Sequence, residues 1–62
     1  MTVSLPDQIT CVEREIAMRK SAYPRWVAGK KLAQAKADHE LAAMQAVLKT
    51  LQAVQSQKEL TP

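Results

Sequence analysis

Basic and aromatic residues are concentrated in the middle of this 62-residue sequence. Between Glu15 and Asp38 there is no acidic residue. Cations without nearby carboxylates attract phosphate groups by long-range steering and by release of counterions. The interval therefore predicts a binding site for an anionic partner. Six of the nine basic residues lie in it: Arg19, Lys20, Arg25, Lys30, Lys31 and Lys36.

The only tyrosine and the only tryptophan, Tyr23 and Trp26, lie in the same interval. Their rings offer flat faces on which a nucleobase can stack, and Arg25 can pair with a phosphate through two parallel hydrogen bonds. In the alternative interpretation the rings close the hydrophobic core and the lysines keep this end of the protein soluble. The two interpretations are compatible. The predicted ligand-binding residues are Arg19, Tyr23, Arg25, Trp26, Lys30 and Lys31.

The sequence does not favour an enzyme. His39 has Asp38 and Glu40 as neighbours, but adjacent side chains on a helix point about 100° apart. Cys11 is the only cysteine and lies far from His39 in the sequence, which makes them a poor metal-binding set and a poor catalytic pair. There is also no glycine-rich phosphate loop. We expect a non-enzymatic protein with no metal and no cofactor.

A helix is predicted before the basic interval, over residues 5–22. Its apolar residues Leu5, Ile9, Val12 and Ile16 are spaced by four, three and four positions, which is one face of a helix. Ser4 stands where a helix cap is preferred, because its hydroxyl can accept a hydrogen bond from a free backbone N–H.

A second helix is predicted over residues 33–57, and the tail 58–62 is expected to be disordered. The apolar residues at positions 37, 41, 44, 48 and 51 again follow the helical spacing. Val47 and Val54 widen this apolar face. The start of the helix lacks a good cap, because Ala33 occupies the position where serine or threonine is preferred.

The segment 23–32 is predicted to be a structured turn. The residue before a proline is disfavoured in the helical conformation, so Tyr23 and Pro24 are expected to end the first helix. Gly29 is expected to adopt the left-handed conformation that closes such an end. Together these elements predict an all-α fold, a two-helix antiparallel hairpin that forms a single domain over residues 1–62.

Size and composition predict self-association. A chain this short buries only about 60% of its unfolded surface, and here the sequence has no phenylalanine and one cysteine. A second, weaker apolar line of Cys11, Met18 and Ala22 widens the face of the first helix. We therefore expect the hairpin to assemble as a homo-oligomeric helical bundle.

The remaining features predict a cytoplasmic protein. The formal net charge is +3 and the sequence pI is about 9.4. The N-terminus does not show a basic start followed by an apolar run, which a secretory leader would have. No window approaches the roughly 20 apolar residues that span a membrane.

Residues 13–32 and 36–44 resemble small proteins encoded by tailed phages and prophages of proteobacteria. The most specific parts are residues 23–27 (Tyr-Pro-Arg-Trp-Val), 29–30 (Gly-Lys) and 36–38 (Lys-Ala-Asp). The resemblance implies a non-enzymatic, oligomeric protein of the host cytoplasm that acts against host defence. Such a protein either binds a defence protein or sequesters a nucleotide signal. Those relatives usually carry serine or threonine where Ala33 stands.

Three functions follow as hypotheses. The first is sequestration of a small anionic nucleotide in a pocket that the tips of neighbouring subunits share. The second is inhibition of a host protein through the tip or an exposed apolar face. The third is a nucleic-acid accessory protein, which predicts strongly salt-dependent binding to DNA or RNA of any sequence.

Overall fold

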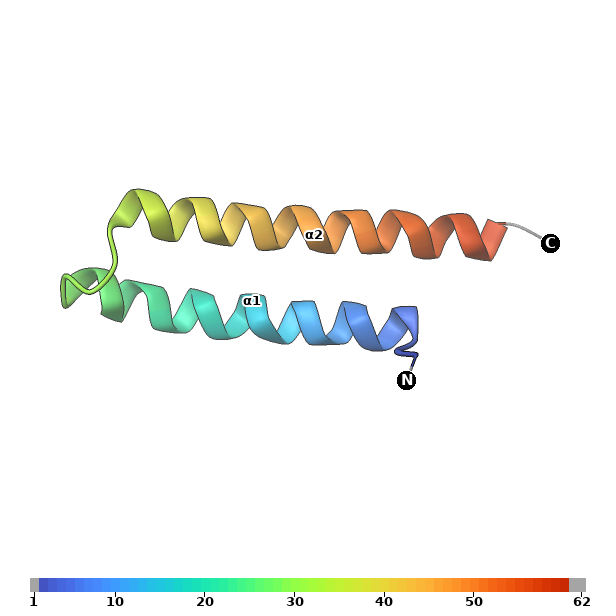
Figure 1. Ribbon diagram of the computed structural model, residues 1–62, viewed down its shortest axis with the longest axis horizontal. Coiled ribbons are helices and arrows are strands. Elements are labelled where there is room, and N and C mark those ends of the chain that lie inside the picture. Colours follow the sequence, from blue (N-terminus) through green and yellow to red (C-terminus); the bar gives the residue numbers. More distant parts are fainter. Residues whose placement is uncertain (1, 61–62) are drawn as a thin grey trace.

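The computed structural model describes residues 2–60 as a hairpin of two antiparallel helices, α1 (Leu5–Ala28) and α2 (Gln34–Leu60). The two helices lie side by side, with the start of α1 and the end of α2 at one end of the molecule and the turn at the other (Figure 1). No strand occurs within the described range. The predicted all-α helical hairpin is confirmed.

The start of α1 is fixed by a side-chain cap. Ser4 has an extended backbone, with φ −64° and ψ 154°, and its Oγ accepts a hydrogen bond of 3.2 Å from the backbone N–H of Asp7. The Gln8 side-chain amide donates to the carbonyl of Val3 over 2.9 Å. These bonds satisfy polar groups that a helix start otherwise leaves to water.

The end of α1 differs from the prediction. The helix does not end at Ala22 but continues through Tyr23 and Pro24 to Ala28. Pro24 lacks an N–H, so this continuation costs one helical hydrogen bond. In return, Tyr23 and Val27, which are four positions apart and half-buried, both face α2. The side-chain burial that this provides outweighs the local preference at the proline.

The turn after α1 also differs from the prediction. Gly29 has φ −81°, and the left-handed residue is Lys30, with φ 59°. The N–H of Lys31 donates to the carbonyl of Trp26 over 2.9 Å, and the N–H of Lys30 donates to that of Val27 over 3.0 Å. This pair of bonds is a Schellman motif, in which the position of Lys30 is normally glycine. The glycine of this sequence, Gly29, is one position before the residue that adopts the left-handed conformation.

Replacing Lys30 with glycine is therefore expected to stabilise the protein by about 0.5–1 kcal/mol, because glycine adopts the left-handed conformation without a Cβ clash. Lys31→Gly removes the same charge at a residue without a positive φ, and it is the matched control. Urea denaturation at one fixed protein concentration measures both. Equal free energies of unfolding for the two variants would contradict the strain assigned to Lys30.

Helix α2 is longer than predicted at its C-terminal end. It begins at Gln34 and runs to Leu60, so residues 58–60 are helical and only residues 61–62 of the expected disordered tail lie outside the described residues. Alanine, glutamine, lysine and glutamate are strong helix formers, and they make up most of residues 52–59. Neither glycine nor proline interrupts α2, so the helix has no internal reason to stop earlier.

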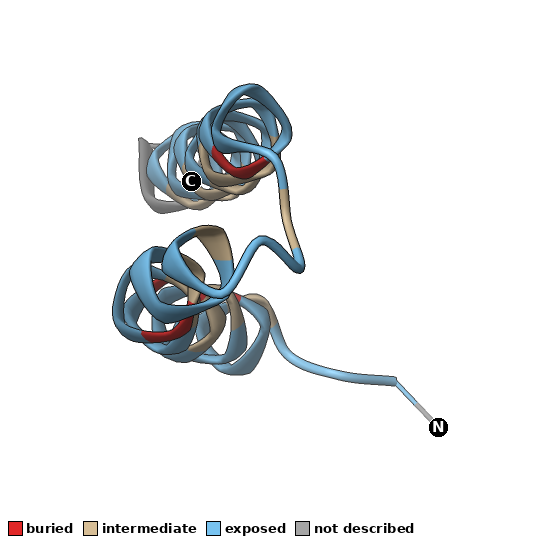
Figure 2. Cartoon of the chain, turned by 90° about the vertical axis from the view of Figure 1, so that its left-hand side faces the viewer, coloured by how far each residue is buried: buried red, intermediate tan, exposed pale blue. Residues whose placement is uncertain are grey.

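The core between the helices is thin. Among the described residues only Ile9, Ile16, Ala22 and Ala37 are buried. Figure 2, a view from the turn end, shows that most of both helices consists of exposed residues. The molecule measures 51 × 21 × 17 Å. Neither helix, over the described range, has an apolar stretch long enough to cross a membrane.

Candidate functional site

The structure separates the six predicted ligand-binding residues into two groups. Arg19 and Tyr23 line a groove between α1 and α2 near the turn. The other four do not line this groove. They lie on the last turns of α1 and in the turn that follows: Arg25, Trp26, Lys30 and Lys31.

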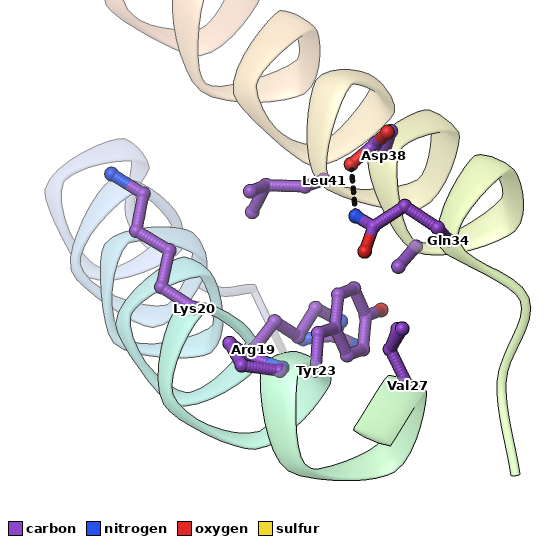
Figure 3. Close-up of a pocket in the computed structure, with 9 residues that line it drawn as sticks. Arg19, Lys20, Tyr23, Val27, Gln34, Asp38 and Leu41 are labelled. Carbon is purple, nitrogen blue, oxygen red and sulfur yellow. Dashed lines mark hydrogen bonds between the residues drawn. The ribbon is translucent and has the colours of Figure 1, made fainter. Parts of the chain in front are cut away.

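The groove has a volume of about 190 Å³ and combines an apolar floor with polar side chains. In Figure 3, Arg19 and Tyr23 on α1 lie across from Gln34, Asp38 and Leu41 on α2. The Gln34 side-chain amide donates to Oδ1 of Asp38 over 2.8 Å. The second carboxylate oxygen of Asp38 remains available as an acceptor. The remaining lining residues are Lys20, Pro24, Val27 and Ala37.

Arg19 is engaged within its own helix. Its guanidinium forms an ion pair with the Glu15 carboxylate at 2.5 Å and also donates to the Glu15 carbonyl over 3.3 Å. The hydrogen bond with Glu15 raises the pKa of Arg19 above its ordinary value, and the neighbouring Tyr23 hydroxyl adds to this effect. Arg19 is therefore a permanent cation whose charge is already balanced, so we assign it to the groove wall.

Four cations at the turn end are unbalanced. Lys36 is near Glu40, with 4.0 Å between Nζ and Oε1, so Arg19 and Lys36 each have a carboxylate partner. No residue that the structure describes forms an ion pair with any of the other four. These four residues, called the basic tip below, are Lys20, Arg25, Lys30 and Lys31.

The two aromatic residues connect the groove to the basic tip. Their ring centroids are 5.6 Å apart, and the ring planes are tilted by 44°. Tyr23 is half-buried in the groove, whereas Trp26 is 45% exposed. Part of the Trp26 ring is therefore open to solvent, and its close aromatic neighbour is Tyr23 in the groove.

Gln34 and Asp38 belong to the groove but were absent from the predicted set. Their four-residue spacing places both on one face of α2, yet the sequence alone did not show that this face lies opposite Arg19 and Tyr23. Elsewhere, Cys11 and His39 are exposed. Within the described part of the chain, no three His, Cys, Asp or Glu side chains are grouped so that they could hold a metal ion.

Comparisons with known proteins do not assign this chain to a family. No family model matches it, and neither a curated protein nor a solved structure does so. The chemistry of the basic tip and the groove is therefore the basis for a proposed function.

Proposed function

We propose that the protein is a non-enzymatic binding protein that captures a small anionic nucleotide at the turn end of the hairpin. One observation carries this proposal: Trp26 is exposed at the same end of the hairpin as four cations that form no ion pair with any described residue. Stacking on an aromatic side chain contributes about 1–3 kcal/mol per base. Arginine and lysine supply the charge-assisted hydrogen bonds that phosphate groups accept. A nucleotide offers both a flat ring and phosphates, so it matches both features.

Hydrogen bonds of the turn fix the backbone of three residues of the basic tip, Arg25, Lys30 and Lys31, next to that of Trp26 and Val27. Lys31 donates its N–H to the carbonyl of Trp26, and Lys30 donates to that of Val27. Arg25 directly precedes Trp26 on α1, and its carbonyl accepts a bond of 2.9 Å from Gly29. Because these bonds fix the backbone before a ligand arrives, less conformational entropy is lost on binding.

The groove is too small to enclose a whole nucleotide. Its volume of about 190 Å³ is below the range of about 300–1,000 Å³ that is typical for pockets that enclose whole drug-sized ligands. It suits one ring or sugar against Tyr23, with Asp38 available to accept an N–H from it. The phosphates then remain outside the groove, at the basic tip.

The resemblance to phage proteins supplies a biological setting for this proposal. Sequestering a nucleotide signal in the host cytoplasm would protect a phage from a defence system that depends on that signal. This setting rests on the resemblance, whereas the binding chemistry rests on Trp26 and the basic tip.

Inhibition of a host protein is the second candidate. The observation that favours it is the exposure of the large apolar side chains Met18, Val47 and Val54, since exposed apolar patches often mark protein-binding surfaces. A nucleic-acid accessory role is the third candidate, and the four unpaired cations favour it. Only the first candidate requires that a small nucleotide binds, and this separates it from the second and the third.

Fluorescence of the single tryptophan tests the proposal directly. Mononucleotides and cyclic dinucleotides are titrated into the protein, with the matching nucleosides and inorganic phosphate as controls. We expect saturable quenching by a nucleotide, and little by its nucleoside, because both the ring and the phosphate are required. Binding confined to long DNA or RNA, with a steep salt dependence, would favour the accessory role. No quenching by any nucleotide would overturn nucleotide capture.

A further inference from the structure

Several apolar side chains lie on one side of the two helices. A groove of about 370 Å³ brings Cys11 and Val12 of α1 next to Val47 and Leu51 of α2. Met18 is seven positions after Cys11, and Val54 is seven positions after Val47, so each extends the same side of its helix. Met18, Val47 and Val54 are 53%, 46% and 39% exposed. The apolar stripe consists of Cys11, Val12, Met18, Val47, Leu51 and Val54.

The exposed area of the chain is too large for a compact protein of its mass. The accessible surface is 4944 Å², whereas a folded monomer of 6.9 kDa exposes about 4,000 Å². The radius of gyration is 14.6 Å, compared with about 11 Å for a compact domain of 62 residues. The excess of roughly 900 Å² is close to the roughly 800 Å² that each partner buries in a stable interface.

We propose that a second copy of the chain covers the apolar stripe and forms a two-fold symmetric dimer with four helices. The six residues of the stripe are uncharged. Val3, Asp7 and Gln8 line the same groove, so the pairing has to leave the Asp7 carboxylate in contact with water to avoid burying an unpaired charge. A two-fold axis brings the same surface of both chains together, so one self-complementary stripe is sufficient. The area that such a pairing removes from water accounts for the excess surface of the single chain.

The charges determine how the two hairpins align. Each basic tip carries four cations without carboxylate partners. A parallel alignment would bring eight such cations together at one end, where repulsion between them is strongly screened only beyond about 8 Å at physiological salt. An antiparallel alignment places the two tips at opposite ends of the dimer. Each tip then holds its ligand without help from the other chain, unlike the shared pocket expected from the sequence.

Sedimentation equilibrium with a matched pair of variants tests the interface. Val47→Glu places a carboxylate in the stripe, and Gln45→Glu adds the same charge to the exposed opposite side of α2, in a separate shallow groove. We expect Val47→Glu to weaken dimerisation at least about 30-fold, since burying an unpaired carboxylate is costly. Gln45→Glu is expected to change the dimerisation constant less than about threefold. A wild-type chain that stays monomeric at high micromolar concentration, or equal effects of the two variants, would overturn the proposal.

Pulsed electron paramagnetic resonance on the intact dimer tests the alignment. Spin labels are attached to Glu13→Cys and, separately, to Ala28→Cys, each in a Cys11→Ala background that keeps the stripe apolar; both labelled positions are exposed. An antiparallel dimer gives a short distance between the labels at position 13 and a much longer one between those at position 28. Short distances at both positions would overturn the antiparallel alignment. Neither result depends on a bound nucleotide, so this test can fail independently of the proposed function.

Discussion

Ile16→Ala is expected to lower the free energy of unfolding at 25 °C by about 2–5 kcal/mol. Ile16 is 7% exposed and is one of the four buried residues in the described part of the chain. Truncating a buried isoleucine to alanine typically costs about 2–5 kcal/mol. At about 0.05–0.15 kcal/mol per residue, the whole domain is worth only about 3–9 kcal/mol. One truncation therefore removes a large part of the total stability.

Circular dichroism during urea denaturation, at one fixed protein concentration, measures this loss. Val3→Ala is the comparison, because Val3 is 50% exposed and precedes α1. We expect it to change the free energy of unfolding by less than about 0.5 kcal/mol. If Ile16→Ala cost no more than Val3→Ala, α1 would not pack on α2 along the face that contains Ile9 and Ile16.

Arg25→Glu is expected to lower nucleotide affinity at least about 100-fold, because a lost charge-assisted hydrogen bond costs about 1.5–3 kcal/mol and the new carboxylate repels phosphate. The fold should survive. Arg25 is exposed and lies in the last turn of α1, where a positive charge interacts favourably with the helix dipole. Reversing that charge costs about 0.3–1 kcal/mol of stability.

Arg14→Glu is the matched control for this change. Arg14 is exposed on α1, far from the turn, and its reversal alters the net charge by the same two units. If general attraction to the positively charged protein drives binding, both variants should lose affinity equally. If the basic tip binds the phosphate, only Arg25→Glu should do so. Undiminished quenching of Trp26 fluorescence in Arg25→Glu would contradict the assigned site.

The spacing of apolar residues was sufficient to predict the hairpin. Ile9 and Ile16 lie on the predicted face of α1 and are buried, and Ala37 on α2 is buried as well. The end of α1 was not predictable in the same way. The local preference at Tyr23 and Pro24 indicates a helix end, but contacts of Tyr23 and Val27 with α2 override it, and such contacts depend on how the two helices align.

The candidate site was predictable only in its composition. The concentration of cations and the two aromatic rings can be read from the sequence. Which cations already have partners depends on side-chain geometry, such as the ion pair between Arg19 and Glu15. The contribution of Gln34 and Asp38 depends on the pairing of the helices, which the apolar spacing of one helix does not specify.

Native mass spectrometry of the protein purified from cells tests nucleotide capture most directly. Spectra are recorded before and after denaturing extraction, so that both the assembly and any retained small molecule are weighed. We expect a dimer that carries one nucleotide-sized mass per chain, released on denaturation and lost in Arg25→Glu. A dimer with no retained mass, combined with no response of Trp26 fluorescence to any added nucleotide, would contradict capture of a nucleotide and favour a protein partner.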